Sequence, residues 1–205
     1  MRKLLLLGAL VGISSLAHAT TITAPSSLNT LEGADAYSWG ISIAVPQGQT
    51  VTSASIDFTS VTLQAADSSG TGYLYTDLLN SQKPGVTTAV DNDAPGDYWA
   101  TQFSGANITT VGSQFFKSVG TTLTWSYVLN ASQLSALNSY LTAGTFNIGI
   151  DPDCHYNVGD LTFVYTVAGN HNTVPDVAAT AALFVLALAG LEVFRRQMVF
   201  AKMKA

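Results

Sequence analysis

Two short acidic segments carry the residues best suited to bind a metal ion. Asp151 and Asp153 stand two positions apart, and Asp91, Asp93 and Asp97 form a second acidic loop. Calcium takes roughly six to eight oxygen ligands from loops of this composition, so these five residues are candidate calcium ligands and calcium is the candidate cofactor. Neither loop has the spacing of an EF-hand. The alternative is that they are turn residues, because Asp side chains readily accept hydrogen bonds from their own backbone.

Aromatic side chains offer a second kind of chemistry, the stacking of flat rings on sugars. Trp39, Trp99, Tyr73 and Tyr75 are the candidate glycan-binding residues. The alternative is that each ring lies in the core, where it removes a large apolar area from water. Tyr73 and Tyr75 share one face of a predicted strand, because alternate side chains of a strand point the same way. The sequence does not decide whether that face or the opposite one is buried.

Sequence patterns of known catalytic sites are missing. Cys154 is the only cysteine, and its neighbour His155 is poorly placed to take the thiol proton because adjacent side chains diverge. One Cys and few His residues do not suffice for a zinc site. The chain has no G-x-S-x-G, H-E-x-x-H or phosphate-binding glycine loop, and Glu32 is the only Glu before the C-terminal tail. We therefore expect no enzymatic activity.

The charge of the central region excludes one class of partner. Between residues 20 and 176 there are 12 acidic and 2 basic residues, which gives a formal charge of −10. Binding to nucleic acid depends on Lys and Arg side chains that neutralise phosphates. The sequence therefore predicts that no nucleic acid is bound.

The N-terminus has the three parts of a secretory signal peptide. Two basic residues precede an apolar run over residues 4–13, and the small residues Ala17 and Ala19 follow. The run is about half as long as the roughly 20 residues that cross a bilayer, which favours a cleaved signal over a membrane anchor. We predict that residues 1–19 are removed by signal peptidase and that Thr20 begins the mature chain.

A second apolar segment stands near the C-terminus. Residues 177–194 contain a single charged residue, Glu192, and as a helix rising about 1.5 Å per residue they would span roughly 27 Å, close to the thickness of the membrane hydrocarbon. Four basic residues lie within residues 195–205, and the positive-inside rule places this end in the cytoplasm and the acidic domain outside. We predict a membrane-spanning helix. A buried core helix would show a polar stripe, which this segment lacks.

The tail combines this span with two short motifs. Val174, Pro175 and Asp176 stand directly before the span, and Arg195 and Arg196 stand directly after it. This order of a Pro-acid motif, one span and an Arg pair resembles the PEP-CTERM class of sorting tails, and most closely its VPDSG-type variant. The resemblance covers about residues 174–196, within a C-terminal sorting tail of residues 174–205, and nothing of the domain before it.

The resemblance implies how the protein is handled. In this family an integral-membrane exosortase recognises the tail, cuts near the Pro-acid motif and passes the domain to the surface of a bacterium that makes exopolysaccharide. The chain would then be in the inner membrane transiently, and afterwards at the cell surface or extracellular. A permanent membrane anchor is the alternative, and the sequence leaves this choice open.

Residues 20–167 are predicted to form one all-β domain. Thr, Val, Tyr and Ile suit pleated strands, and Gly, Asn, Asp and Ser mark the turns between them. About seven short strands predict an antiparallel β-sandwich, with a jelly roll as one form of it. The alternation slips once near Ser60, which indicates a bulge. The expected strands are residues 39–45, 51–63, 72–79, 98–103, 121–129, 145–150 and 160–167.

One segment of the domain predicts a helix. Asn130 is a good N-cap, Gln133 completes a capping box, and Gly144 marks the end. We expect one short helix across an end of the sandwich, with a row of leucines that faces the core. These are Leu134, Leu137 and Leu141. Residues 168–173 are polar and are predicted to be a tether that exposes the sorting motif.

These features lead to three functional hypotheses. The first is an exported, non-catalytic protein with a structural or adhesive role in exopolysaccharide or biofilm. The second is a carbohydrate-binding module assisted by calcium. The third is a polysaccharide hydrolase that uses two Asp residues. The expected partners are signal peptidase, an exosortase-type membrane protease, exopolysaccharide and, before processing, the membrane.

Overall fold

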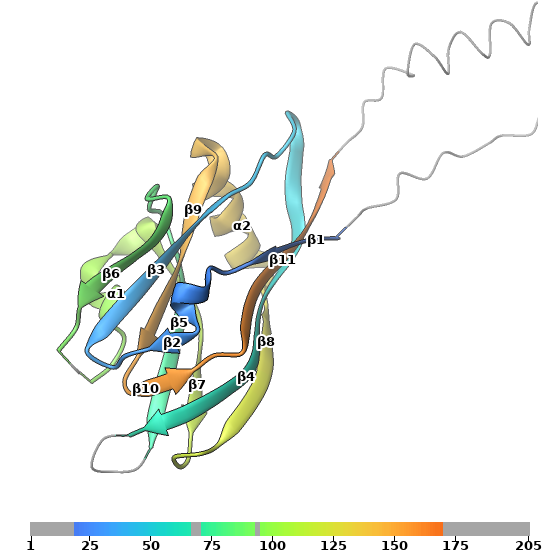
Figure 1. The fold of residues 1–205 in the computed structure, drawn as a ribbon. Coiled ribbons are helices and arrows are strands. Elements are labelled where there is room, and N and C mark those ends of the chain that lie inside the picture. Colours follow the sequence, from blue (N-terminus) through green and yellow to red (C-terminus); the bar gives the residue numbers. More distant parts are fainter. Residues whose placement is uncertain (1–18, 67–70, 93–94, 170–205) are drawn as a thin grey trace, which may run out of the picture. The chain divides into compact units, whose positions relative to one another are not determined.

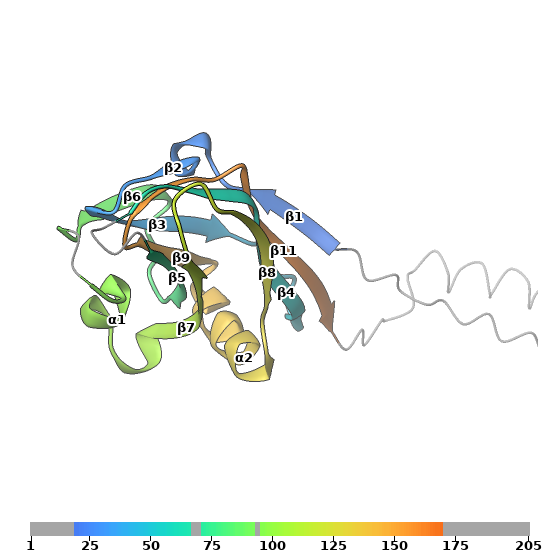
Figure 2. The same cartoon turned by 90° about the horizontal axis from the view of Figure 1, so that it is seen from below.

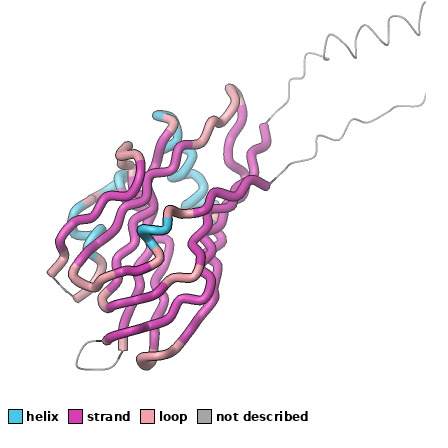
Figure 3. The backbone as a smooth tube through the Cα atoms, in the orientation of Figure 1, coloured by secondary structure: helices cyan, strands magenta, loops and turns pink. Residues whose placement is uncertain are grey.

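The computed structural model describes residues 19–66, 71–92 and 95–169 (Figure 1). The chain divides into a unit of residues 1–168 and a unit of residues 169–205, and the structure described below is that of the first unit. Strands dominate it (Figure 3) and form two sheets. The predicted β-sandwich is therefore confirmed, whereas the jelly-roll form stays a prediction.

Sheet A has the strand order β1-β11-β4-β10-β2, and β8 also pairs with β4. The central strand β4 is long enough, at 17 residues, to serve several partners. The first and last strands of the domain are neighbours, because β1 pairs with β11 from Ala19 opposite Thr166 to Thr23 opposite Thr162. The strands are β1 (Ala19–Thr23), β2 (Thr30–Leu31), β4 (Gln49–Ala65), β8 (Thr122–Val128), β10 (His155–Asn157) and β11 (Asp160–Gly169).

Sheet B has the strand order β6-β3-β9-β5-β7 and is antiparallel throughout. Its central strand β9 lies between β3 and β5, so β9 is shielded on both edges. The strands β6 and β7 form the two edges. The strands are β3 (Asp35–Ser42), β5 (Gly72–Leu79), β6 (Gly85–Val90), β7 (Ile108–Phe116) and β9 (Thr145–Pro152).

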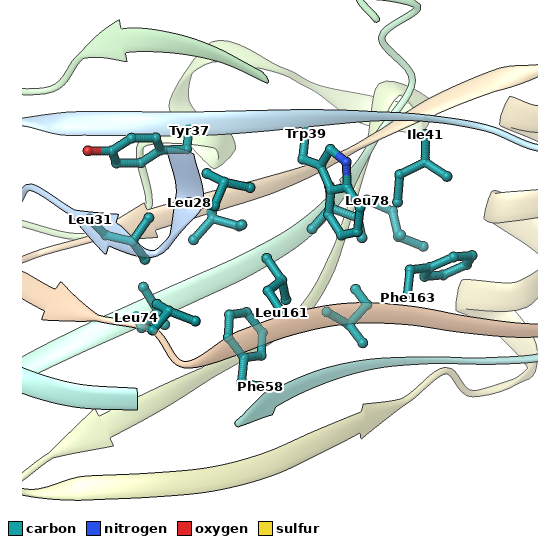
Figure 4. Close-up of a cluster of buried hydrophobic side chains, with 14 of the residues drawn as sticks. Leu28, Leu31, Tyr37, Trp39, Ile41, Phe58, Leu74, Leu78, Leu161 and Phe163 are labelled. Carbon is teal, nitrogen blue, oxygen red and sulfur yellow. The ribbon is translucent and has the colours of Figure 1, made fainter. Parts of the chain in front are cut away.

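The core lies between the inner faces of the two sheets. Phe58 of β4 and Phe163 of β11 come from sheet A, and Trp39, Leu74 and others come from sheet B (Figure 4). Trp39 is only 3% exposed, so its ring packs entirely inside the sandwich. Burying each large side chain of this kind contributes about 1.5–3 kcal/mol, and this burial holds the sheets together.

The predicted bulge and capping box are both present. The pairing of β4 with β8 shifts between Phe58 and Val61, and Ser60 in this gap has a φ of 52°. The helix α2 (Ala131–Tyr140) begins with the Asn130 side chain accepting from the Gln133 backbone N–H, while the Gln133 side chain accepts from the Asn130 N–H. A positive φ of 83° at Gly144 ends the segment.

The helix α2 links the two sheets, because it contacts β4 of sheet A and β5, β7 and β9 of sheet B (Figure 2). Leu137 and Leu141 are buried, and Leu134 packs against the core, as predicted. Three single-turn 3-10 helices complete the described elements. They are η1 (Ser26–Leu28), η2 (Gly105–Asn107) and η3 (Leu141–Ala143).

One predicted strand is wrong. Residues 98–103 form the helix α1 (Tyr98–Gln102), so the domain has a second short helix. The cause is Asp97, whose side-chain oxygen accepts a hydrogen bond from the Ala100 backbone N–H at 3.2 Å and caps the helix. The aromatic residues that suggested a strand lie instead at helical spacing, with the ring centroids of Trp99 and Phe103 6.0 Å apart.

Strand boundaries and number also differ from the prediction. The strand expected at residues 39–45 is β3, which covers Asp35–Ser42 because its first residues pair with β6. Beyond it, the Ile43 N–H bonds to the Gly144 carbonyl outside the ladder. Five strands, β1, β2, β6, β7 and β10, were not expected. Each of these five is held in its sheet by pairing with one or two neighbouring strands, which supply the pattern that its own sequence lacks.

Both predicted terminal signals lie largely outside the described residues. Ala17, the sorting motif at residues 174–176, the span at residues 177–194 and the pair Arg195 and Arg196 are not described. Ala19 and Thr20 are described and form the start of β1. Among the residues that the structure describes, no helix is both long enough and apolar enough to cross a membrane.

Candidate functional site

The outer face of sheet B collects most of the residues singled out in the sequence. Along β5, Leu74, Thr76 and Leu78 are buried, whereas Tyr73 is exposed and Tyr75 is half-buried. Because side chains alternate along a strand, the tyrosines therefore lie on the outer face and the Leu74 face is the core. This settles the question that the sequence left open for Tyr73 and Tyr75.

Three aromatic residues form what we call the aromatic strip: Tyr73, Tyr75 and Phe115. Tyr73 pairs with Phe115 of β7, and their ring centroids lie 4.9 Å apart. Tyr73 and Tyr75 stack with centroids 5.8 Å apart and planes inclined by 21°. Tyr73 is 41% exposed and Phe115 is 43% exposed, so the strip presents flat apolar surface to solvent. Contiguous exposed apolar surface of this kind is typical of a binding site.

The Tyr75 hydroxyl adds a hydrogen-bond donor to the strip. Burial first, and the nearby Asp153 carboxylate second, raise the pKa of Tyr75 to about 12. The phenol therefore stays protonated at neutral pH and can donate to a ligand oxygen.

The two tryptophans predicted as glycan contacts lie elsewhere. Trp39 is in the core. Trp99, at 7% exposure, is buried on the outer face of sheet B, where it packs with Ala36 and Leu79 under α1. A Cβ on Gly149 would lie 2.8 Å from Trp99 Cδ1, so the missing side chain at Gly149 lets the indole reach the sheet. Neither indole offers a face to a sugar.

Beneath the start of α1 lies a group of carboxylates that we call the acidic cluster: Asp77, Asp91, Asp97, Asp151 and Asp153. Asp151 is fully buried, and its Oδ2 accepts a hydrogen bond from the Tyr98 backbone N–H at 2.7 Å. The charges of Asp91, Asp97 and Asp153 all act on Asp151, and those of Asp97 and Asp151 act on Asp77. The fold therefore brings the two predicted acidic loops together, while Asp93 lies outside the described residues.

Asp77 is the member of this cluster that the sequence analysis missed. It has 0% exposure and lies on the outer face of β5, two residues along from Tyr75. The available signal was its position, an acid inside a predicted strand that is otherwise mostly aromatic and apolar. It was not recognised because burial there depends on α1, which was predicted as a strand.

Burial changes the proton affinity of both buried carboxyls. Desolvation first, and the negative charge of Asp97 second, raise the pKa of Asp77 to about 8. Desolvation also raises the pKa of Asp151 to about 7, although the hydrogen bond from the Tyr98 N–H opposes this rise. Each carboxyl is thus far easier to protonate than an exposed aspartate.

The candidate metal ligands are close together but not arranged as a finished site. Within residues 19–66, 71–92 and 95–169, no group of three or more His, Cys, Asp or Glu side chains is placed to hold a metal ion. The calcium assignment therefore stays a prediction. Asp97 shows the alternative, turn-like behaviour, because its side chain caps α1.

Cys154 and His155 point away from each other. Cys154 is buried, and its thiol is 3.4 Å from the Thr71 carbonyl oxygen, to which it donates. The His155 side chain is 50% exposed, and its Nε2 lies 2.6 Å from Glu32 Oε2. Cys154 lies in the bend before β10 and His155 is the first residue of that strand, and their different partners leave the imidazole unplaced to take the thiol proton.

A cavity of about 310 Å³ opens beside α1 on the same outer face of sheet B. Tyr98, Gln102 and Phe103 line it from the α1 side, and Lys83 and Thr87 line it from the β6 side. Its lining combines rings with hydroxyl, amide and ammonium groups. Such a lining suits a ligand with both apolar and hydroxylated surfaces.

Comparison with known proteins identifies the tail. A family model for the VPDSG-CTERM motif matches residues 173–198, and no curated protein matches the chain. The chain therefore carries a PEP-CTERM-type C-terminal sorting signal, as its resemblance to that class implied. This signal implies export through the membrane and processing by an exosortase-type system. The match covers the tail alone, so it gives no information about the function of the sandwich domain.

Proposed function

We propose that the sandwich is a non-catalytic adhesive component of the exopolysaccharide matrix, which it contacts through the aromatic strip. The sorting signal supports delivery to the cell surface or beyond. The observation that carries the adhesive role is the aromatic strip, where Tyr73 and Phe115 leave two-fifths of their area exposed beside Tyr75. The proposal combines the first functional hypothesis with the glycan contact of the second.

The chemistry of the strip suits a polysaccharide. A sugar ring has an apolar face of C–H groups, which can cover a flat aromatic ring and remove its apolar area from water. Its hydroxyl groups can accept from the Tyr75 phenol, which is protonated at neutral pH. The rings lie along β5 and its edge-strand neighbour β7, so a long chain can pass over them without meeting a closed pocket.

The buried position of the acids supports a non-catalytic role. A glycosidase places two carboxyl groups on either side of the bond that it cleaves. Asp77 and Asp151 are both 0% exposed and lie under α1, where a polysaccharide cannot reach them. The hydrolase hypothesis therefore gains no support from the most unusual carboxyls of the domain.

Retention on exopolysaccharide tests the proposal. The wild-type protein recovered from its host should bind saturably to that host's polysaccharide in a pull-down. The double variant Tyr73→Ala with Phe115→Ala should bind at least about tenfold more weakly, a loss of ~1.4 kcal/mol. A matched control is Val128→Ala, because Val128 is an exposed apolar residue, 74% accessible, on β8 of the other sheet.

Two results would overturn the proposal. One is the absence of saturable binding by the wild-type protein to any fraction of the host polysaccharide. The other is equal binding by the wild type, the strip variant and the Val128→Ala control, which would show that the exposed rings do not contact the polymer. Release of reducing sugar during the incubation would contradict the non-catalytic part.

A further inference from the structure

Two buried carboxylates in this fold lack the partners that buried charges require. Asp77 is 0% exposed, and among the described residues neither of its carboxylate oxygens meets the geometry of a hydrogen bond, although the Thr110 and Asp97 side chains lie close enough to act on its pKa. Asp151 is also 0% exposed; its Oδ2 accepts from the Tyr98 N–H, but its Oδ1 has no partner in the part of the chain that the structure describes. Buried polar groups are almost always satisfied in native proteins, and a buried anion without compensation is strongly destabilising.

The sheet register points both side chains at the same space. Tyr75 pairs with Asp151 and Asp77 pairs with Gly149, so Asp77 and Asp151 are diagonal neighbours on the outer face of β5 and β9. Diagonal neighbours on one face are about 7–8 Å apart, a span that one cation with two carboxylate ligands can bridge. Gly149 carries no side chain, and the Trp99 ring and the Leu79 side chain occupy the position that a Cβ there would take.

The segment before α1 closes this space from above. Tyr98 donates its backbone N–H to Asp151, and Trp99 packs against the sheet next to Gly149. The residue before them, Asp97, adds a third negative charge that acts on both Asp77 and Asp151. Three carboxylates from three separate segments therefore converge. Among the described residues, neither lysine of the domain forms an ion pair with any of them.

We propose that the acidic cluster is a calcium-binding site, with Asp77 and Asp151 as the inner ligands and Asp97 closing it from the α1 side. Calcium suits this donor set because it takes roughly six to eight oxygens in adaptable geometry, whereas magnesium demands a near-ideal octahedron. Water would supply the oxygens that the carboxylates do not. Since no three acids are already in place to hold an ion, binding must draw Asp97 inward.

This inference does not depend on glycan binding by the aromatic strip, so the two can fail separately. Calcium would neutralise the buried charges and would fix the start of α1 to the sheet. In the absence of calcium, protonation is the only other way to neutralise them, and the raised pKa of Asp77 shows how strongly neutralisation is favoured. The site would therefore act as a calcium-dependent clasp between sheet B and the α1 segment.

Calcium titration of the full chain in detergent at pH 8, after treatment with EDTA, tests this proposal. Calorimetry should show saturable binding, and the melting temperature should rise by about 5–10 °C at a calcium concentration near one hundred times Kd. Asp77→Asn should abolish both effects. Asp160→Asn should leave them unchanged, because Asp160 is an exposed acid on β11 of the other sheet.

Each outcome decides the matter. Asp77→Asn should also raise the calcium-free melting temperature, because it removes an uncompensated buried charge. If Asp77 had only a structural role, the variant would not show both this higher melting temperature and the loss of the calcium response. If this variant does not fold, hydrogen exchange at the Tyr98 amide in the wild-type protein replaces it, and calcium should slow that exchange. Absence of saturable binding in the wild type, or an unchanged calcium response in Asp77→Asn, would overturn the proposal.

Discussion

Replacing Asp77 by Asn should change the way in which stability depends on pH. In calcium-free buffer the wild-type carboxyl must lose its proton as the pH rises, although it is fully buried beside the Asp97 carboxylate. The amide has nearly the same shape but never acquires a charge. We therefore expect the variant to resemble the wild type near pH 4 and to be clearly more stable at pH 8.

The size of this effect follows from the pKa of Asp77. Burial raises that pKa from 3.8 to about 8, so the folded state holds the proton more tightly than the unfolded state does. The stabilisation is complete below about pH 4 and is lost as the pH rises through about 8. A rise of this size corresponds to a free energy on the order of 5 kcal/mol, comparable to the whole stability of many domains.

Urea unfolding of both proteins at pH 4, 6 and 8, in EDTA, measures the effect. The free energy of unfolding of the wild type should fall by several kcal/mol across this series, while that of Asp77→Asn should fall much less, with Asp151 responsible for the remaining slope. The m-values should agree, because the fold is the same. Parallel pH profiles for the two proteins would refute the reasoning and would mean that Asp77 is solvated in solution.

Three further variants test individual contacts by urea unfolding. Gly149→Ala places a Cβ 2.8 Å from Trp99 and should cost about 1–3 kcal/mol while exposing the indole, seen as a red shift in its fluorescence; an unshifted spectrum would contradict the packing. Asn130→Ala removes the cap of α2 and should cost about 1 kcal/mol, so a neutral result would mean that the capping box contributes nothing. Glu32→Gln breaks the half-exposed ion pair with His155 and should lower the free energy of unfolding by less than about 1 kcal/mol. A larger loss would show that the Glu32 carboxylate stabilises the fold by more than a surface ion pair does.

The elements that could be predicted are those whose own residues show the full pattern of a strand or a helix, with its ends. The residues of β5 were predicted with their observed bounds, and Asn130 with Gln133 specified the start of α2. The bulge at Ser60 was visible because one strand, β4, is long enough to show both phases of the alternation. In each case a local pattern and the tertiary structure agree.

The missed elements depend on partners far away in the sequence. The edge strand β7 alternates weakly, and its place in sheet B is set by pairing with β5. For α1, the β propensity of its aromatic residues conflicted with the Asp97 cap, and the cap prevailed because Trp99 could then pack against Gly149. No property of the α1 residues alone shows that a glycine in the distant strand β9 leaves room for the indole.

The candidate site was predictable in its parts and not in its assembly. The two acidic loops were identified from composition, but their meeting with Asp77 depends on the sheet register and on the α1 cover. Likewise the tyrosines of the aromatic strip were identified, whereas their exposed partner Phe115 lies on the strand β7, which was not predicted. Adjacency across strands is a property of the fold and has no local sequence signal.

The most direct test of the account as a whole is the intact mass of the protein recovered from the outside of its native host. We predict a chain that begins at Thr20 and ends close to Asp176, cut once after the signal peptide and once at the sorting motif. Recovery of a chain that retains residues 177–205, or of the complete polypeptide from the cytosol, would contradict delivery by an exosortase-type system.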